Sequence, residues 1–249
     1  MSTTLDVVIP VLNEEQALAA SVRTLHSYLS ENLDAYEWRI LVADNGSTDS
    51  TPEVCRVLSE ELGEVTYLRL EQRGRGRALK KAWMESAADI VCYMDVDLST
   101  GLDALPELVA AFESPEYDLA IGSRLAKGAE VRGRTLKREF ISRAYNLLLR
   151  AMFFTAFRDA QCGFKAASRR AVTDLAPLVV DNGWFFDTEL LILAEKNGYA
   201  VKEVPVTWTD DPDTKVKVLG TAWEDFKGLL RLRFGGLKRA SRSLGEGSG

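Results

Sequence analysis

The 249-residue chain is 46% hydrophobic and 27% charged, so it can bury the core of one large domain and is neither disordered, collagen-like nor a coiled coil. Its 31 basic and 37 acidic residues give a net charge of −6, which argues against a general nucleic-acid-binding protein. The charge is uneven, because residues 124–150 hold eight Lys/Arg and two Glu, a local net charge of +6.

The first half of the chain alternates short apolar runs with amphipathic segments. Apolar runs typical of buried strands occupy residues 5–9, 38–43, 65–70, 90–94 and 119–122. Segments with helical periodicity lie between them, at residues 14–28, 50–62, 76–88 and 103–112. Strands that alternate with helices are joined by right-handed crossovers. The sequence therefore predicts an α/β fold, a single Rossmann-like domain with a mostly parallel, twisted sheet flanked by helices.

The second half is less regular. It is predicted to contain a charged loop at residues 123–135, helices at 137–157, 168–178, 184–196 and 222–234, and a strand at 200–208. The helix at 137–157 is basic at its start and aromatic at its end, and the helix at 222–234 is amphipathic. The tail of residues 236–249 is basic at first and ends in Gly and Ser, so it is expected to be flexible.

Other counts limit the chemistry and the location. Met1 leads directly into a strand pattern, and the longest apolar stretch, residues 147–157, is far shorter than the roughly 20 residues of a membrane-spanning helix. The three cysteines match no metal-binding spacing and predict reduced thiols in a cytosolic protein. The single histidine, His26, lies in an amphipathic segment, which disfavours a histidine-centred triad or a multi-histidine metal site.

Polar residues follow three of the predicted strands. Asn13 and Glu14 follow the first strand, Asp44 ends the second, and Asp95 and Asp97 follow the fourth. Open α/β sheets place their ligands at the carboxyl ends of the strands, so we expect these side chains to converge on one crevice. A D-x-D triplet alone is usually solvated turn chemistry. Directly after an apolar strand, however, the two carboxylates can both reach a hard divalent cation, which prefers oxygen ligands and bridges to phosphates.

Two further signals each have a structural and a functional interpretation. Asp44 with Asn45-Gly46-Ser47 can form an Asx turn that caps the next helix, or it can bind the base or ribose hydroxyls of a nucleoside. Gly74-Arg75-Gly76-Arg77 opens a helix whose amides favour an anion, or it is only a basic turn. It is not the dinucleotide fingerprint, because no third glycine follows.

Taken together, the motifs resemble those of the family 2 inverting glycosyltransferases of the type A fold. The resemblance rests on residues 8–15 (VIPVLNEE), 44–49 (DNGSTD) and 95–99 (DVDLS). Later segments resemble the polyprenyl-phosphate (dolichyl-phosphate) glucosyl and mannosyl synthases, at residues 122–124 (GSR), 137–146 (KREFISRAYN), 159–165 (DAQCGFK) and 184–190 (WFFDTEL). The match runs in order from about residue 5 to 235, which would form the catalytic domain.

The resemblance implies a role for each half of this domain. Residues 1–122 would bind the donor, a UDP-sugar or GDP-mannose, and residues 123–235 the acceptor, a polyprenyl or dolichyl monophosphate. The nucleotide would contact Pro10, Asn13, Glu14, Asp44, Gly74, Arg77 and Asp95. Asp95 and Asp97 would hold Mg²⁺ or Mn²⁺ on the diphosphate. The acceptor phosphate would be bound by Arg124, Arg138, Ser142 and Lys215, of which the first three would also belong with Asp95 and Asp97 to the catalytic set.

The type of acceptor decides whether a general base is needed. A phosphate is mostly ionised at neutral pH, so it can displace the nucleoside diphosphate directly and invert the anomeric carbon. The alternative is a soluble or protein acceptor, whose hydroxyl would need a carboxylate base such as Asp187 or Glu189. A binding module without catalysis would be expected to lose Asp95 and Asp97, and a nucleotidyltransferase normally has a Gly-rich signature directly after the first strand.

The sequence departs from the family pattern in two places. Ala43 and Asn45 replace acidic residues beside Asp44. The short loop after Trp208 looks closer to the glucosyl branch, which favours a UDP-sugar. Many family members carry transmembrane helices, whereas here residues 222–234 and the aromatic residues at 153, 154 and 157 belong either to the core or to a membrane-contacting surface. We therefore expect a cytoplasmic protein in peripheral contact with the inner face of the membrane.

Overall fold

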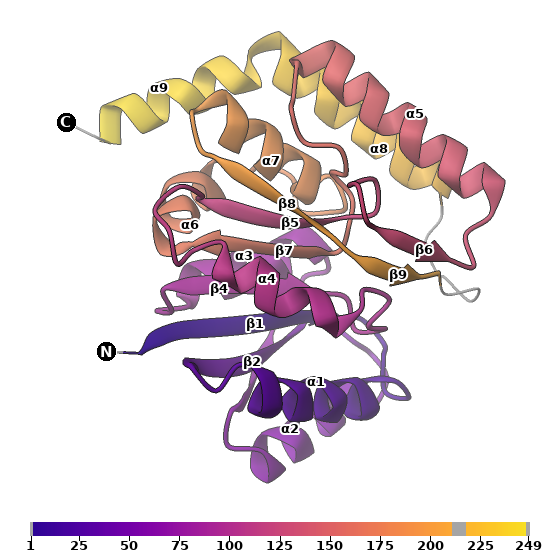
Figure 1. Cartoon of the computed structure of the whole chain (residues 1–249), viewed down its shortest axis with the longest axis vertical. Helices are drawn as coiled ribbons and strands as arrows, with labels where there is room; N and C mark the ends of the chain where they lie inside the picture. Colours follow the sequence, from indigo (N-terminus) through magenta and orange to yellow (C-terminus); the bar gives the residue numbers. More distant parts are fainter. Residues whose placement is uncertain (1, 211–217, 248–249) are drawn as a thin grey trace.

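A seven-stranded sheet forms the centre of the protein, with helices on both of its faces (Figure 1). The computed structural model describes residues 2–210 and 218–247. In spatial order the strands are β3 (Val65–Arg69), β2 (Tyr36–Asp44), β1 (Thr3–Val11), β4 (Ile90–Met94), β7 (Phe164–Ser168), β5 (Leu119–Ser123) and β8 (Val201–Pro205). β9 (Thr207–Thr209) follows β8 almost directly and pairs with β6 (Glu130–Arg132) in a small second sheet.

The pairings in the large sheet are parallel except those of β7, which is antiparallel to both β4 and β5. This arrangement confirms the predicted α/β fold with a mostly parallel sheet. Because β1, β2 and β4 run parallel, their carboxyl ends lie at the same edge, and the polar loops after them meet there. The chain reverses direction to form β7, so the amino end of β7 reaches that same edge beside the end of β4.

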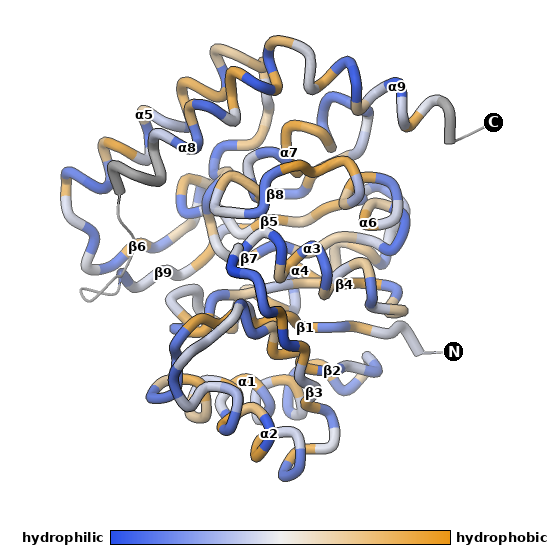
Figure 2. Tube along the Cα trace, turned by 180° about the vertical axis from the view of Figure 1, so that it is seen from behind, coloured by the Kyte–Doolittle hydropathy of each residue, from blue (hydrophilic) through white to orange (hydrophobic). Residues whose placement is uncertain are grey.

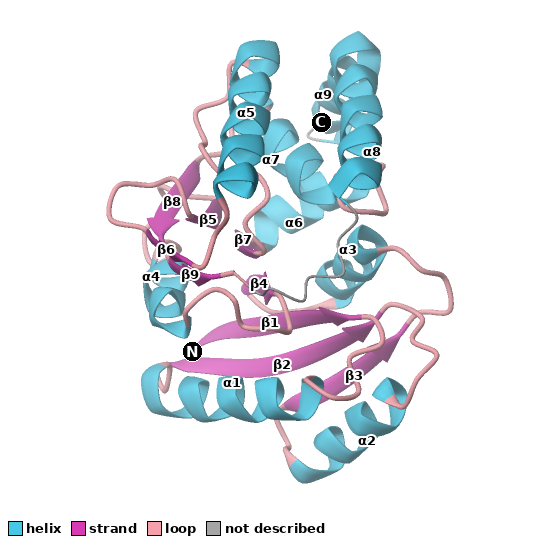
Figure 3. Ribbon diagram, turned by 90° about the vertical axis from the view of Figure 1, so that its right-hand side faces the viewer, coloured by secondary structure: helices cyan, strands magenta, loops and turns pink. Residues whose placement is uncertain are grey.

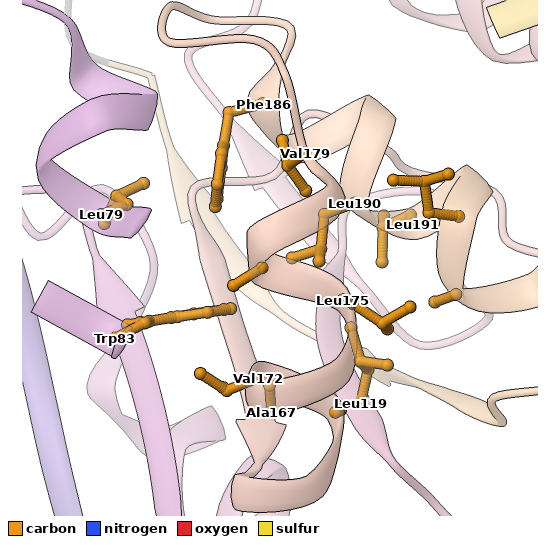
Figure 4. Packing of buried hydrophobic residues seen from close by; sticks show 14 of the residues in the cluster. Leu79, Trp83, Leu119, Ala167, Val172, Leu175, Val179, Phe186, Leu190 and Leu191 are labelled. Atoms are coloured by element: carbon orange, nitrogen blue, oxygen red, sulfur yellow. The ribbon is translucent and has the colours of Figure 1, made fainter. Parts of the chain in front are cut away.

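Two hydrophobic cores lie on opposite faces of the sheet. Alternate residues of β1 divide between them, with Val8 in one core and Val7 and Ile9 in the other. Helices on one face are α3 (Arg75–Glu85), α6 (Arg169–Leu175), η2 (Ala176–Leu178) and α7 (Phe186–Lys196), and Figure 4 shows Trp83 and Phe186 directed into this core. Helices on the other face are α1 (Leu18–Asn32), α2 (Thr51–Glu61), η1 (Leu102–Ala104) and α4 (Leu105–Ala110) (Figure 3).

Helices α5 (Leu136–Phe153), α8 (Val218–Arg231) and α9 (Leu237–Gly247) stand together at one end of the molecule (Figures 1 and 3). The Thr135 hydroxyl caps α5 by accepting a hydrogen bond from the amide of Arg138. α5 ends at Phe154, which takes a left-handed φ of 53°. The helix predicted for residues 137–157 is therefore shorter at its end, because the backbone turns there toward Asp159.

Two other segments differ from the sequence expectations. β7 falls where we predicted no strand, since the run Phe164–Ser168 is short, rich in alanine and too brief to show a period. No helix is predicted for residues 236–249, which are expected to be flexible, whereas residues 237–247 form α9, linked to α8 by the π-helical turn η3 (Leu232–Gly236). Ala240 of α9 is buried, and Leu237 packs against the core, so apolar contacts hold this helix in place.

The structure also bears on the thiols and on the membrane. Cys55, Cys92 and Cys162 are all free and buried, and burial raises the pKa of each thiol. Across residues 2–210 and 218–247, we find no helix with the length and apolarity needed to span a bilayer.

Helix α8 is fastened to the domain through a buried carboxyl group. Asp225 is 2% exposed, and its Oδ2 accepts a hydrogen bond of 2.7 Å from the Gln161 side chain. Its Oδ1 finds no hydrogen-bond partner among the described residues. Burial raises the pKa of Asp225 to about 6; the Tyr145 hydroxyl opposes this rise, and the negative charge of Asp181 adds to it.

Asp225→Asn should therefore stabilise the protein above pH 6 and have little effect near pH 4. The folded state holds this proton more tightly than the unfolded state, so the wild-type free energy of unfolding falls as the pH rises from about 4 to about 6. Two pKa units correspond to a ceiling of about 3 kcal/mol. Urea unfolding of both proteins at pH 4.5 and pH 8 measures the difference. If the free energies of unfolding of the two proteins differed by the same amount at both pH values, the raised pKa of Asp225 would be wrong.

Candidate active site

The loops after β1 and β2 are tied to each other by hydrogen bonds. Asn13, with a left-handed φ of 56°, accepts a hydrogen bond of 2.8 Å from the Thr48 amide and donates its own amide to Ser47 Oγ at 2.9 Å. The amide of Glu14 donates to Thr51 Oγ1 at 2.8 Å. The structure thus brings Asn13 and Glu14 to the second strand end as predicted, and Pro10 lies in β1 opposite Ala43 in the same region.

Asp44 is completely buried and stabilises its own loop. Its Oδ1 accepts a hydrogen bond of 2.8 Å from the Ser47 amide, and its Oδ2 accepts one of 2.9 Å from the Tyr67 hydroxyl. The Arg69 guanidinium lies 3.4 Å from the same Oδ2. Asp44 therefore stabilises the turn in its own loop, as one of the two interpretations predicts, but the Ser50 side chain makes no hydrogen bond that caps α2. Contact with a nucleoside stays a prediction.

The glycines at the start of α3 serve close packing. Gly74 has a φ of 148°, and a Cβ atom there would lie 2.5 Å from the Asn182 carbonyl oxygen. A Cβ on Gly76 would lie 2.6 Å from Cβ of Phe186. Glycine therefore lets the first turn of α3 press against the segment that leads into α7. We predicted that Arg77 binds the nucleotide. In this structure its guanidinium donates to the carbonyl oxygen of Arg73 at 3.1 Å, and contact with a nucleotide stays a prediction.

Asp95 and Asp97 occupy the end of β4 as predicted. The Asp95 side chain is about one-third exposed, and Asp97 is exposed, with its Oδ1 accepting a 2.9 Å hydrogen bond from the Ser99 amide. The Asp95 carboxylate lies against Gly163, just before β7, where a Cβ atom would be 1.7 Å from Oδ2. No group of three or more His, Cys, Asp or Glu side chains suited to a metal ion occurs in the described residues.

Arg75 is a residue of the site that the sequence analysis did not single out. It is 9% exposed, and its guanidinium donates to Asp95 Oδ1 at 2.7 Å and to Asp187 Oδ2 at 2.8 Å. Its Cζ atom lies 5.0 Å from the ring centres of both Tyr93 and Trp184. Arg75 therefore joins the carboxylate at the end of β4 to the first turn of α7. It stands between Gly74 and Gly76, a pattern that predicts an anion at the helix amides and not a role for this side chain.

Asp187 is the centre of a buried cluster of charges. Besides Arg75, the Lys165 ammonium lies 3.5 Å from Asp187 Oδ1, and the Tyr93 hydroxyl donates to the same oxygen. Burial alone would raise the pKa of Asp187, but the charges of Lys165 and Arg75 outweigh burial and lower it. Glu189, two residues further along α7, accepts two 2.7 Å hydrogen bonds from Arg231 of α8.

Arg124 and Arg138 are brought together by β9 and the residue after it. Arg124 forms a bidentate pair with the fully buried Asp159, at 2.7 and 2.8 Å, and lies 4.8 Å from the ring centre of Trp208. Burial raises the pKa of Asp159, but the Arg124 charge outweighs it, so the pKa falls below its ordinary value. Arg138 donates to Asp210 Oδ2 at 2.7 Å, and Asp210 Oδ1 accepts from the Trp208 indole at 3.1 Å.

Ser142 lies one turn after Arg138 on the same side of α5 and is 8% exposed. Asn146 follows after another turn, and its side chain donates to the Ser142 carbonyl at 2.9 Å and accepts from the Ala160 amide at 3.0 Å. The inner face of α5 thus carries polar groups next to the Arg124–Asp159 pair. Lys215, the fourth predicted phosphate contact, lies outside the described residues.

These strand-end carboxylates and the α/β architecture agree with a known protein family. The Glycosyl transferase family 2 model matches residues 6–175, from β1 to the end of α6. The chain belongs to this family. The family membership confirms the resemblance noted from the strand-end motifs.

Two named glycosyltransferases are similar in sequence to this chain. Glycosyltransferase AglD of Haloferax volcanii is 41% identical over 214 residues, which cover 86% of this chain and 34% of AglD. A dolichyl-phosphate beta-glucosyltransferase of Saccharomyces cerevisiae is 27% identical over 247 residues, which cover 92% of this chain and 74% of the yeast protein. This chain therefore spans about a third of the length of AglD and about three quarters of the yeast enzyme.

Solved structures with the same fold come from glucosyl-3-phosphoglycerate synthase of Mycobacterium tuberculosis. A complex with Mn²⁺, UDP-glucose and phosphoglyceric acid matches with a TM-score of 0.71 and 22% identity, covering 94% of this chain and 80% of the synthase chain. The likeness confirms the predicted type A glycosyltransferase fold.

Proposed function

We propose that this chain transfers a hexose from a nucleotide sugar to a polyprenyl monophosphate, with inversion at the anomeric carbon and with the help of a divalent cation. The name of the yeast relative, dolichyl-phosphate beta-glucosyltransferase, supports a lipid monophosphate as acceptor and glucose as the sugar. The short loop after Trp208 also favours a UDP-sugar donor over GDP-mannose. A lipid acceptor further implies that the protein works in peripheral contact with a membrane.

The choice between a hydroxyl and a phosphate acceptor rests on whether Asp187 or Glu189 can act as a general base. A hydroxyl acceptor would need a carboxylate that is able to take up a proton. Asp187 is neutralised by Arg75 and Lys165 and has a lowered pKa, and Glu189 is engaged by Arg231 through both oxygens. Both are therefore poor bases in this arrangement. A phosphate acceptor needs no such base, because it is already ionised at neutral pH.

Asp95 and Asp97 suit a divalent cation held between the protein and the donor diphosphate. Arg75 occupies Asp95 Oδ1, while Asp95 Oδ2 faces the space that Gly163 leaves without a side chain. Two carboxylates are enough for Mg²⁺ or Mn²⁺ when phosphate oxygens and water complete the shell. The cation would neutralise the charge that develops on the departing nucleoside diphosphate. The Mn²⁺ present in the solved structure with UDP-glucose supports this assignment.

The remaining groups position the two substrates. Asn13, Glu14 and Asp44 lie at the strand ends where the nucleoside would bind, with Pro10, Gly74 and Arg77 nearby in the sequence-based assignment. Arg138, Ser142 and the Arg124 region would hold the acceptor phosphate, joined by Lys215. A phosphate oxygen would attack the anomeric carbon as the bond from that carbon to the diphosphate oxygen breaks. Orientation and charge stabilisation would supply most of the rate.

A panel of donors and acceptors tests the proposal. Purified protein with Mn²⁺ should transfer glucose from UDP-glucose to a short-chain polyprenyl phosphate in detergent, and GDP-mannose should be a poorer donor. The variant Asp187→Asn forms the second part of the experiment. It removes the carboxylate that pairs with Arg75 and Lys165, a candidate base for a hydroxyl acceptor, and it leaves the proposed phosphate ligands in place. Efficient transfer to a soluble hydroxyl acceptor, with none to polyprenyl phosphate, would contradict the proposed acceptor and favour the alternative.

A further inference from the structure

Large hydrophobic side chains gather at one end of the molecule. Of the thirteen exposed ones in the described part of the chain, six belong to α5 and its cap, and three to α8 and η3. These are Leu136, Phe140, Ile141, Leu147, Leu148 and Phe154 in the first group, and Trp223, Phe226 and Phe234 in the second. Scattered single residues are normal on a protein surface, whereas a concentration on two neighbouring elements indicates a contact surface.

The most exposed residues of α5 form a single stripe. Leu136, Phe140 and Leu147 are 90%, 74% and 67% exposed, and their spacing of four and seven residues places them on one side of the helix. Phe154, which is 83% exposed, follows as the residue that ends the helix. The inner side of the same helix is buried through Ser142, Asn146, Leu149 and Phe153. We call these four exposed residues the outer stripe of α5. Figure 2 shows the resulting alternation of hydrophobic and hydrophilic residues along the helix.

Positive charges flank the outer stripe. Lys137, Arg143 and Arg150 are exposed on α5, and Arg158 is exposed just beyond it, 3.7 Å from the Glu203 carboxylate. The only acidic residue within α5, Glu139, pairs with Arg143 and with Arg134 from the preceding loop. This end of the molecule is therefore apolar and basic on a chain whose net charge is −6. Apolar side chains bordered by Arg and Lys match the interface of a bilayer that contains anionic lipid.

Aromatic residues of α8 and η3 extend the same chemistry. Trp223 and Phe226 are 61% and 41% exposed and stack with ring centres 6.0 Å apart. Phe234 is 82% exposed beside the exposed Arg233, at the kink before α9. Aromatic rings with nearby cations are favoured at the level of lipid headgroups.

We propose that the outer stripe of α5, assisted by the exposed aromatic residues of α8 and η3, docks the protein on a bilayer that contains anionic lipid. The inference extends the proposed function, because Arg138 and Ser142 lie on the inner side of the same helix. Since an α-helix is about 10 Å thick, docking through its outer side brings the acceptor-binding side close to the headgroup layer from which a lipid phosphate would come.

Vesicle sedimentation tests the docking. Wild-type protein should bind vesicles of phosphatidylcholine mixed with phosphatidylglycerol more tightly than vesicles of phosphatidylcholine alone, and added salt should weaken the binding. Leu147→Glu combined with Phe154→Glu should reduce binding to the mixed vesicles by about tenfold or more, because the stripe then carries two negative charges. The matched control is Val57→Glu with Met84→Glu, two residues of α2 and α3 that are 43% and 48% exposed and should leave binding unchanged.

Further measurements separate this inference from the proposed function. The stripe variant should keep wild-type transfer to a short-chain polyprenyl phosphate in solution, since neither residue belongs to the site. Absence of vesicle binding by the wild type, or equal binding by the stripe variant, would overturn the docking and leave the function intact. A change in the oligomeric mass of the stripe variant without lipid would assign the stripe to a protein interface and also overturn it. Vesicle binding without transfer to polyprenyl phosphate would overturn only the function.

Discussion

Asp97→Ala is expected to lower kcat/KM for sugar transfer on the order of 10³-fold, even at saturating Mn²⁺. The carboxylate lies at the end of β4 next to Asp95, and stabilisation of a departing diphosphate by a bound cation amounts to several kcal/mol. Asp95→Asn should have a similar effect and should also release Arg75, which is paired with Asp95 at 2.7 Å. Initial rates over a range of donor and Mn²⁺ concentrations measure the loss.

Asp34→Ala is the matched control for the metal-site variants. Asp34 is an exposed carboxylate just before β2, at the opposite edge of the sheet, so its removal should leave transfer unchanged. Thermal unfolding should show that Asp97→Ala keeps its fold, because the Asp97 side chain is exposed. If the Asp97→Ala enzyme retains more than a tenth of the wild-type rate at saturating Mn²⁺, the metal role of this residue is wrong.

Arg124→Ala is expected to lower the free energy of unfolding by about 3–5 kcal/mol. Asp159 is completely buried, and removal of Arg124 leaves its charge without a partner in a region that excludes water. The lost pair also releases the Trp208 ring, on which the guanidinium rests. Chemical denaturation at pH 7 measures the change. At lower pH the deficit should shrink, because Asp159 can then be neutralised by a proton.

Arg170→Ala provides the comparison for an exposed pair. Its side chain is 72% exposed and its guanidinium lies 3.6 Å from Asp118, so its loss should cost no more than about 1 kcal/mol. Replacing Asp159 together with Arg124 should recover part of the stability, since no unpaired charge then remains. If the single Arg124 variant is as stable as the Arg170 variant, the Arg124–Asp159 pair is not the structural element described here.

The first half of the fold could be predicted because its signals are local. Each strand from β1 to β5 is an apolar run closed by a polar loop, and each helix between them shows its own period. β7 could not be recognised in this way, because its place between β4 and β5 is set by pairing with strands far away in the sequence. The end of α5 was missed for a similar reason: Phe154 is apolar, and only its left-handed backbone ends the helix.

In the site, too, some features follow from local sequence and others depend on contacts between distant parts of the chain. Asp95 and Asp97 could be predicted from one strand end, without knowledge of any partner. The buried partners of Arg75 and Arg124 are Asp187 in α7 and Asp159 in the loop after α5, and they follow no fixed spacing. The sequence pattern therefore indicated which side chains could bind a metal ion or a phosphate group. Tertiary contacts determine which of them are already neutralised in the folded protein.

The antiparallel strand β7 also sets the order in which the sheet can form on the ribosome. β1, β2, β3 and β4 can pair with one another as soon as Met94 has emerged, because their hydrogen-bonding partners all lie in that stretch. β5 is made next, but both of its neighbours, β7 and β8, come later in the chain. Until β7 arrives, β5 remains an unpaired strand with three core residues, Leu119, Ala120 and Ile121, and β4 remains an open edge. A nascent chain of that length is therefore the form most exposed to aggregation and most in need of a chaperone.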